Sequence, residues 1–360
     1  MMKKRKLSKT ARRDYLTYAV VLTAFVVMQI LSSTGSISST LRGQLVPICA
    51  YVIMALSLNL TVGVLGELSL GHAGFMSIGA FTGAVVASAM NGSGVPDTWI
   101  LVIALASGAL LAAVVGLLIG IPVLRLNGDY LAIVTLAFGE IIKSVFNNLY
   151  IGIDSNGLHV SFLKNTIELQ SGGRMILSGA MGIPGIRKIS TFFAGAVLVL
   201  LSLVIIFHLV RSRAGRAIMA IRDNRIAVES VGINITTYKM MAFVLSAAIA
   251  GVGGALFGLG QNTIIASKFD FNASILILVF VVLGGQGNML GSIIAATVLT
   301  ILPEALRQFA DYRMLVYAIV LILVMLVTNN PTLKGQLGRL VSGIHPKKHQ
   351  NAPKEVERNE

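Results

Sequence analysis

The stretch LNLTVGVLGELSLGHAGFMSIGAFTGA, residues 58–84, decides the fold. It is apolar at both ends, and a glycine-rich segment, GELSLGHAG (66–74), interrupts it. Similar apolar segments recur along the 360 residues, of which 55% are hydrophobic and only 12% charged, whereas soluble domains carry about 25% charged residues. The chain is therefore predicted to be a polytopic membrane protein, because lipid solvates apolar surface that water cannot.

Segments long enough to cross a bilayer of about 30 Å, which takes about 20 helical residues, occur ten times. They run over about 15–32, 45–64, 69–90, 98–121, 129–148, 189–210, 239–260, 272–285, 289–306 and 313–328. The sequence thus predicts an all-α transmembrane helix bundle of about ten spans. The eighth segment is short and runs into GGQGNMLG (284–291), which predicts a discontinuous helix or a re-entrant turn. The two interruptions have comparable surroundings in the two halves of the chain, as in transporters built from inverted repeats.

The placement of charge predicts the orientation. With the N-terminus in the cytoplasm, twenty of the 29 Lys and Arg residues lie inside and eight outside, as the positive-inside rule requires. We therefore expect a basic cytoplasmic N-terminus (1–14), a transmembrane domain (15–328) and a cytoplasmic, disordered tail (329–360). Within the transmembrane domain, 149–188 forms an outer loop and 211–238 a cytoplasmic one. No small-residue cleavage site follows the first apolar run, so an uncleaved helix is expected rather than a signal peptide.

The basic residues also bear on possible partners. The formal net charge is +14, but the basic residues lie between apolar runs and at the termini, without interleaved aromatic residues. This distribution argues for contact with membrane lipid and against nucleic acid.

Glycines are spaced for close helix packing. Gly79–Gly83, Gly116–Gly120 and Gly254–Gly258 each form a GxxxG pair inside an apolar run. This spacing lets helix backbones approach each other in lipid. We expect a densely packed bundle, with a glycine-lined transport path as the alternative.

Polar residues inside the spans are candidates for function, because they are costly in a bilayer. Glu67 and His72 flank the first break, where they would line or gate a path, or else lie at a membrane boundary in contact with water. Gly74 belongs to the same break, and the glycines of the second break are Gly284, Gly285 and Gly287.

The fifth span carries three further charges. Asp129 opens the span, where a carboxylate suits the free N–H groups of a helix start. Glu140 and Lys143 are three residues apart, a spacing that predicts an ion pair. Asp129 and Glu140 are also candidates for a transport path.

The segment RAGRAIMAIRDNRIAVESVGI (213–233) is charged, although it lies between long apolar runs. It predicts two short helices, with Gly215 freeing the backbone after the sixth span and Asp223 or Asn224 capping the second helix. Ile218 and Ile221 are expected to present an apolar edge to a groove on a partner. The alternative is a helix on the membrane surface whose arginines bind anionic lipid.

No enzyme motif is present in the sequence. It contains no GxxxxGK[ST] phosphate loop, HExxH, GxSxG or paired cysteines. No catalytic, cofactor-binding or metal-binding residues are predicted, so any ATPase that drives transport is another polypeptide. A self-contained secondary carrier or channel is the alternative, although lone charges deep in the spans are few.

Four motifs resemble the permease subunit of bacterial branched-chain amino acid ABC importers, in its LivM type. They are residues 58–84, GDYLAIVTLAFGEII (128–142), residues 213–233 and VVLGGQGNMLGSIIAA (281–296), and the resemblance covers about 45–330. It implies ATP-driven uptake of leucine, isoleucine or valine across the inner membrane, with a LivH-type permease, two cytoplasmic ATPases that bind ATP and Mg, and a periplasmic binding protein. Relatives that import urea and short amides leave the substrate open.

The resemblance also implies roles for individual residues. The 213–233 segment corresponds to the loop that docks on the ATPases, and the positions carried over, together with the capping Asp223, are Gly215, Arg216, Ala220, Arg222, Asn224, Ala227 and Gly232. In the outer loop Asn156 and Gly157 match the family pattern, whereas the double glycine usual before them is missing from GIDSNGL (152–158).

Overall fold

The computed structural model describes residues 9–35, 38–91, 94–126, 128–154, 157–163, 167, 173–305, 318, 319 and 322. The chain divides into two compact units, 1–305 and 306–360. In the second unit, 318, 319 and 322 are described, all as helix. The predicted span 313–328 therefore lies almost wholly outside the described residues, and the tail 329–360 lies entirely outside them. The architecture below is that of the first unit.

Helices dominate the first unit. The α-helices are α1 (Lys9–Ser33), α2 (Ser39–Asn59), α3 (His72–Ala89), α4 (Asp97–Val123), α5 (Asp129–Asn147), α6 (Phe192–Arg211), α7 (Arg213–Asp223), α8 (Arg225–Ser230), α9 (Ile235–Gly258), α10 (Phe271–Gly284) and α11 (Met289–Ala305). A π-helix, η1 (Leu60–Leu65), continues α2, and two short 3₁₀ turns are η2 (Gly179–Met181) and η3 (Ala266–Lys268). The strands are β1 (Leu149–Asp154), β2 (Gly157–Phe162) and β3 (Arg174–Ser178).

The first nine predicted spans each correspond to a helix, which confirms the all-α bundle. Among the described residues, seven helices are long and apolar enough to cross a membrane: 14–33, 39–65, 72–89, 97–123, 192–211, 235–258 and 266–284. Helix α5, with its three charged residues, is not one of them, and α11 is a shorter apolar helix. The inverted repeat stays a prediction.

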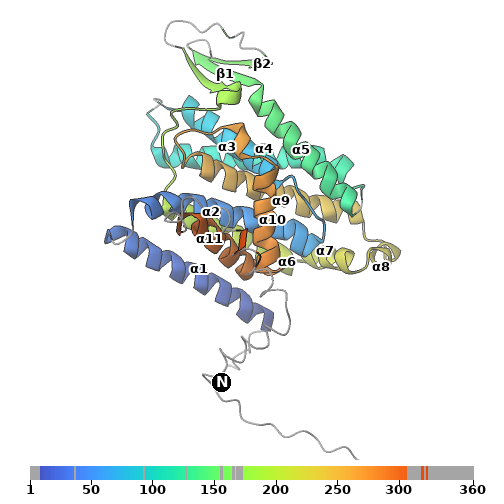
Figure 1. Ribbon diagram of the computed structural model, residues 1–360. Coiled ribbons are helices and arrows are strands. Elements are labelled where there is room, and N and C mark those ends of the chain that lie inside the picture. Colours follow the sequence, from blue (N-terminus) through green and yellow to red (C-terminus); the bar gives the residue numbers. More distant parts are fainter. Residues whose placement is uncertain are drawn as a thin grey trace, which may run out of the picture. The chain divides into compact units, whose positions relative to one another are not determined.

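The bundle has two distinct ends. Figure 1 shows α7 and α8 at one end, away from the three strands, and we call these the α7 end and the sheet end. An ion pair between Arg211 and Asp14 holds the start of α1 at the α7 end. Helix α2, continued by η1, runs through the centre, with 89% of its most apolar window buried, whereas only 6% of the α1 window is buried.

Glycines make the closest helix contacts at the centre of the bundle, as the GxxxG pairs predicted. A Cβ atom at Gly79 would lie 2.0 Å from the carbonyl oxygen of Gly251, and one at Gly254 would lie 2.0 Å from that of Met76. A Cβ atom at Gly116 would lie 2.6 Å from the Cβ of Ala247. Helices α3, α4 and α9 therefore pack backbone to backbone, which replaces the hydrophobic driving force that lipid does not provide.

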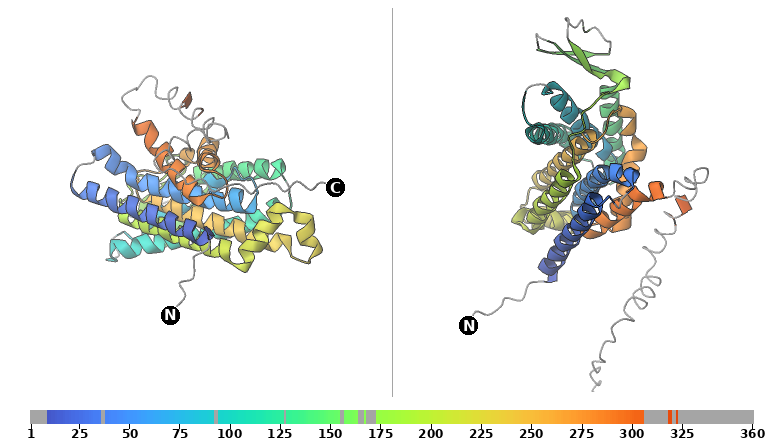
Figure 2. Two further views of the ribbon diagram at one scale, coloured as in Figure 1. Left: turned by 90° about the horizontal axis from the view of Figure 1, so that it is seen from below. Right: turned by 90° about the vertical axis from the view of Figure 1, so that its left-hand side faces the viewer.

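Helices α10 and α11 form a hairpin that enters the bundle from the sheet end. Phe269, just before α10, packs edge to face on Phe81 in the middle of α3 and on Phe257 at the end of α9. Glycines allow the tight turn, because a Cβ atom at Gly284 would lie 2.3 Å from the backbone nitrogen of Ser292. The break predicted at 284–291 is present as the turn between α10 and α11, and whether it is re-entrant stays a prediction. Figures 1 and 2 show α5, α10 and α11 on the same face of the bundle.

A small sheet was not foreseen in the 149–188 segment. Its strand order is β2-β1-β3, and both pairings are antiparallel. The β1–β2 hairpin pairs Asp154 with Gly157, whose φ of +123° suits glycine. The turn between these strands contains Asn156, which lies outside the described residues.

We expect Gly254→Ala to lower the stability of the bundle, because the added Cβ atom would meet the Met76 carbonyl oxygen at 2.0 Å and push α3 away from α9. Overpacking of this kind costs about 1–3 kcal/mol. Thermal unfolding of the detergent-solubilised protein measures the effect. Gly43→Ala is the matched control, since Gly43 is an exposed helical glycine with nothing within 4 Å of an added Cβ. Equal unfolding temperatures for the two variants would contradict the packing.

Candidate functional site

The first candidate feature is the break after α2. The α-helix widens into the π-helix η1 at Leu60 and ends at Gly66, whose φ is +82°. π-Helical turns often mark functional sites. The next helix, α3, begins only at His72. Residues 66–71 turn back into the bundle, since Leu70 lies against Thr135 of α5 and His72 against Ser57 of α2.

Side chains from distant helices satisfy the broken backbone. The Leu70 N–H donates to Thr135 Oγ1 (3.0 Å), and the Ala73 N–H donates to Ser274 Oγ (3.2 Å). The His72 Nε2 atom lies 3.1 Å from Ser57 Oγ and 3.0 Å from Ser246 Oγ. Every one of these side chains is buried. The break is therefore a packed polar cluster rather than an open channel within this chain.

The second break lies directly against the first. The turn between α10 and α11 contains Gly285 and Gly287, with φ of +89° and +78°. The Gly287 N–H donates to Asn59 Oδ1 (2.7 Å), and Asn59 Nδ2 donates to Ser292 Oγ (2.9 Å). A Cβ atom at Gly63 would lie 2.1 Å from the Gly287 nitrogen, so only glycine permits this contact. Asn59, which joins the two breaks, was missed in the sequence, although an amide inside the apolar run 45–64 was a usable signal.

The α7–α8 segment folds as two short helices, as predicted. Asn224 caps α8, because its Oδ1 accepts from the Ala227 N–H at 3.1 Å. The roles given to two isoleucines were wrong: Ile218 is fully buried and Ile221 is 4% exposed. Ile221 packs within this chain on Val228 and Ile235. Helical periodicity revealed the apolar edge, but not that the chain's own helices cover it.

Gly215 serves close packing rather than freedom of the backbone. It lies inside α7, and a Cβ atom there would lie 2.2 Å from the Leu209 carbonyl oxygen at the end of α6. This contact fixes α7 against the transmembrane helix that leads into it. Gly232, with φ of +79°, makes the turn after α8.

The exposed surface of the segment is mixed. Ile226 and Val231 are 81% and 72% exposed. The side chains of Arg216, Asp223, Arg225 and Ala227 are also exposed, and Ala220 is partly buried beside Ile221. Two apolar side chains on a charged rim are typical of a protein-binding surface.

Arg222 joins this segment to the breaks. Its Nη1 donates to the Gly63 carbonyl oxygen at 2.6 Å. Its aliphatic stem lies on Gly66, where a Cβ atom would be 2.3 Å from Arg222 Cγ. Gly63 in turn touches Gly287. A continuous series of contacts therefore runs from the α7 surface through the first break to the second.

Glu67 and His72 are not at a solvated boundary, contrary to that interpretation. The side chains of Glu67 and Lys239 are 13% and 5% exposed and form an ion pair. His72 is 1% exposed. Each residue has a partner more than 170 positions away in the sequence, Lys239 for Glu67 and Ser246 for His72, so local composition did not reveal their burial.

The remaining predicted residues lie on or against α5. Asp129 is exposed in the first turn of α5, but the N-cap is Gly128 and no side chain caps the helix, so the capping role was wrong. The predicted ion pair between Glu140 and Lys143 is confirmed. Gly74 lets α3 approach α5, since a Cβ atom there would lie 3.0 Å from the Cα of Gly139.

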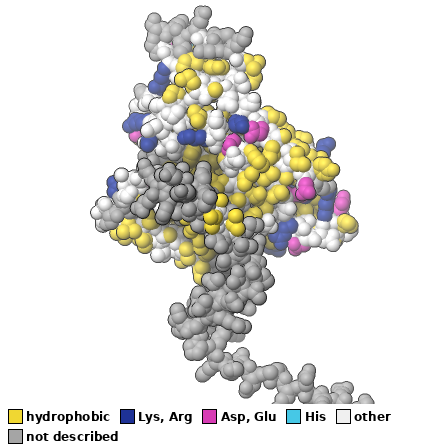
Figure 3. All heavy atoms as spheres, viewed as in Figure 1, with side chains coloured by type: hydrophobic (Ala, Val, Ile, Leu, Met, Phe, Trp, Pro, Cys, Tyr) yellow, Lys and Arg dark blue, Asp and Glu magenta, His cyan; other side chains and the backbone are white. Residues whose placement is uncertain are grey.

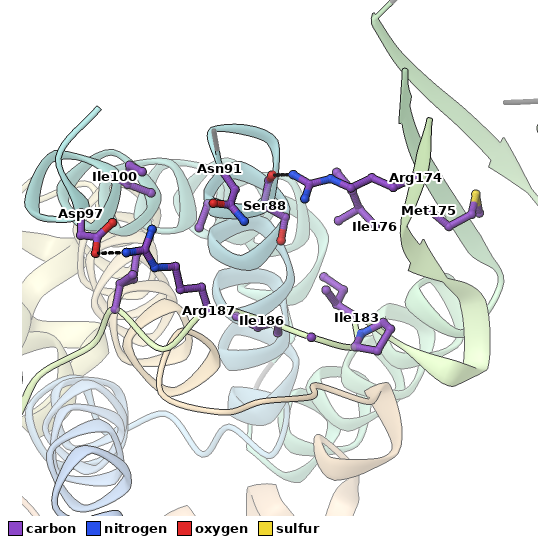
Figure 4. Close-up of a pocket in the computed structure, with 14 residues that line it drawn as sticks. Ser88, Asn91, Asp97, Ile100, Arg174, Met175, Ile176, Ile183, Ile186 and Arg187 are labelled. Carbon is purple, nitrogen blue, oxygen red and sulfur yellow. Dashed lines mark hydrogen bonds and ion pairs between the residues drawn. The ribbon is translucent and has the colours of Figure 1, made fainter. Parts of the chain in front are cut away.

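A small pocket opens at the sheet end, between β3, α3 and the start of α4. Figure 4 shows Arg174 pointing towards Ser88 and Arg187 towards Asp97, and the second pair is 2.9 Å apart. The cavity volume is about 80 Å³, well below the range of roughly 300–1,000 Å³ usual for ligand sites. These arginines therefore tie the 149–188 segment to the bundle, and the pocket is too small for an amino acid.

Comparison with known proteins identifies the family. A family model described as "Branched-chain amino acid transport system / permease component" matches residues 40–325. The chain belongs to this family. The LivM permease protein of the high-affinity branched-chain amino acid transport system is 39% identical in Salmonella typhimurium, over 289 residues, and 38% identical in Escherichia coli, over 286 residues. The LivH permease protein of Salmonella typhimurium is 27% identical over 300 residues, which are 80% of this chain and 91% of LivH.

The coverage differs between the two types of relative. The LivM alignments span 77% of this chain and 66% of each LivM protein. No solved structure matches this chain significantly. The family match and the apolar helices together show that the chain is a multi-pass membrane permease of the LivM type.

Breaking the ion pair between Glu67 and Lys239 should destabilise the permease. Lys239→Met leaves a buried carboxylate without its partner, which costs about 3–5 kcal/mol. The double variant Glu67→Gln with Lys239→Met leaves no lone charge and should regain most of that loss. Unfolding midpoints of the single and double variants measure the coupling, and additive effects of the two changes would contradict it.

Proposed function

We propose that this chain is a membrane-spanning subunit of an ATP-driven importer that moves branched-chain amino acids across the bacterial inner membrane. The observation that carries the proposal is the hydrogen bond from Arg222 in α7 to the Gly63 carbonyl oxygen in η1. A charged surface segment thereby contacts the broken transmembrane helix directly. The family match over residues 40–325 supports the transport role.

The proposal assigns the partners as well. LivM and LivH permeases occur in the same named transport system, so a LivH-type chain is the second permease. Two cytoplasmic ATPases hold ATP and Mg, and a periplasmic protein delivers the substrate. The excess of Lys and Arg supports a cytoplasmic N-terminus, tail and α7 end, with the sheet end outside.

The ATPases would bind the exposed part of the α7–α8 segment. Ile226 and Val231 supply the apolar centre, and the neighbouring arginines supply the polar rim. Because α7 is packed tightly on the end of α6 through Gly215, the segment moves as a unit with that helix. ATP binding that closes the ATPase pair would then displace Arg222 and, through Gly63, the second break.

Uptake by the reconstituted complex tests the proposal. Proteoliposomes with both permeases, the ATPases and the binding protein should accumulate leucine, isoleucine or valine only with internal ATP. Urea and acetamide belong in the panel, and uptake of these compounds alone would overturn the proposed substrates. Uptake by this chain without the ATPases would indicate a secondary carrier instead.

The docking surface is tested in the same complex. Ile226→Asp puts a charge at the centre of the proposed interface and should weaken ATPase association by roughly tenfold or more, as expected for an apolar anchor at an interface. Met181→Asp is the control, because Met181 is 75% exposed but lies at the sheet end. ATPase capture on immobilised permease measures the difference. Capture of equal amounts by both variants would refute the docking surface.

Arg222 is predicted to couple ATP hydrolysis to transport. Arg222→Met keeps the stem on Gly66 but removes the charged donor to the Gly63 carbonyl, an interaction worth about 1.5–3 kcal/mol. We expect the ATPases to remain bound and active while uptake falls roughly tenfold or more. Arg222→Lys retains a cationic donor and should recover part of the uptake. Normal uptake by Arg222→Met would contradict the coupling role.

A further inference from the structure

The exposed face of α5 carries a charge pair at an unusual position. Tyr130, Ile133, Ala137 and Ile141 follow one exposed stripe along the helix. The ion pair of Glu140 and Lys143 lies along one edge of this stripe, with side chains 40% and 24% exposed. The pair is therefore accessible from outside this chain, unlike the buried polar cluster of the first break.

Along the axis of α5, the pair also lies level with the first break. Gly139, the residue before Glu140, contacts Gly71 and Gly74 of the first break, and Thr135 bonds to Leu70 one turn earlier. Glu140 is thus level with the point at which α3 begins. In transporters built on broken helices, substrates bind beside the breaks.

A helix face that carries charged side chains is poorly solvated by lipid hydrocarbon. Charged side chains within a bilayer face the bundle interior or a water-filled cavity, because contact with hydrocarbon is costly. Figure 3 shows a largely hydrophobic face with a few acidic and basic side chains set into it. The α5 face therefore needs a cover that brings both apolar surface and water, which a second permease provides.

We propose that the exposed face of α5 lines the translocation path at the seam with the second permease, and that Glu140 and Lys143 bind the passing substrate. The Glu140 carboxylate receives the substrate ammonium group, and the Lys143 ammonium receives the substrate carboxylate. This inference rests on the proposed function, since it assumes a zwitterionic amino acid. The two side chains form an ion pair with each other, which the charges of the substrate would replace.

Neutral variants separate this role from a structural one. A purely structural pair loses stability when one charge is removed and recovers when both are removed. A substrate-binding pair loses uptake in both cases. We expect the double variant Glu140→Gln with Lys143→Gln to assemble and hydrolyse ATP like wild type while leucine uptake falls roughly tenfold or more, because charged hydrogen bonds to the substrate are lost. The control removes the ion pair at the sheet end, with Asp97→Asn and Arg187→Gln, and should leave uptake unchanged.

Access of water to the stripe gives a second readout. The chain has one cysteine, Cys49, which is buried, so Cys49→Ala provides a clean background. In the assembled complex, Ala137→Cys should react with a membrane-impermeant maleimide, and leucine should slow the reaction. Val27→Cys on the peripheral helix α1 should stay unlabelled.

The outcomes distinguish the two proposals. If the wild-type complex takes up no amino acid, the proposed function fails. If it takes up leucine and the double neutral variant does so at the same rate, or if Ala137→Cys stays unlabelled, the assignment of the α5 face is overturned while the importer function stands.

Discussion

A backbone that leaves helical geometry inside a membrane must find every hydrogen-bond partner within the protein, because hydrocarbon supplies none. This constraint governs the arrangement of the bundle around the two breaks. The side chains of Thr135, Ser274 and Asn59 accept hydrogen bonds from the N–H groups of Leu70, Ala73 and Gly287, respectively. The Arg222 side chain donates to the Gly63 carbonyl oxygen. The partners come from four different helices, so the breaks hold together α2, α5, α7 and α10. A position that looks like a local weakness in the sequence is thus tied by hydrogen bonds to four helices.

The sequence predicted what depends on local pattern. The lengths of the apolar segments predicted the first nine spans. The GxxxG spacing predicted the close contacts of α3, α4 and α9, and the three-residue spacing of Glu140 and Lys143 predicted their ion pair. It failed where burial depends on distant segments. Glu67 pairs with Lys239 and His72 contacts Ser246, each more than 170 positions away, and the helices that cover Ile218 and Ile221 are not visible in their own periodicity. The strands were missed although a signal was present, since Leu149, Ile151 and Ile153 alternate with other residues before the Ser-Asn-Gly stretch, and Leu158, Val160 and Phe162 alternate after it.

The glycine contacts and the breaks play complementary roles. Where a Cβ atom would lie 2.0 Å from a facing carbonyl oxygen, no side-chain layer can yield, so α3 and α9 cannot slide past each other without separating. At the breaks, hydrogen bonds from single side chains accompany the glycine contacts, and side chains can change rotamer. We therefore expect rearrangement to be easier at the breaks than between α3 and α9.

The π-helical turn of η1 has a consequence for how this helix can vary. A π-helical turn is an α-helix that holds one residue too many. Deleting a single residue between Leu60 and Leu65 would restore α-geometry, and everything after it would rotate by about 100° around the helix axis. Gly66 would then turn away from Arg222, and the Gly63 carbonyl would lose its donor. The number of residues in this one turn therefore sets the contact between Arg222 and the first break as much as their identity does.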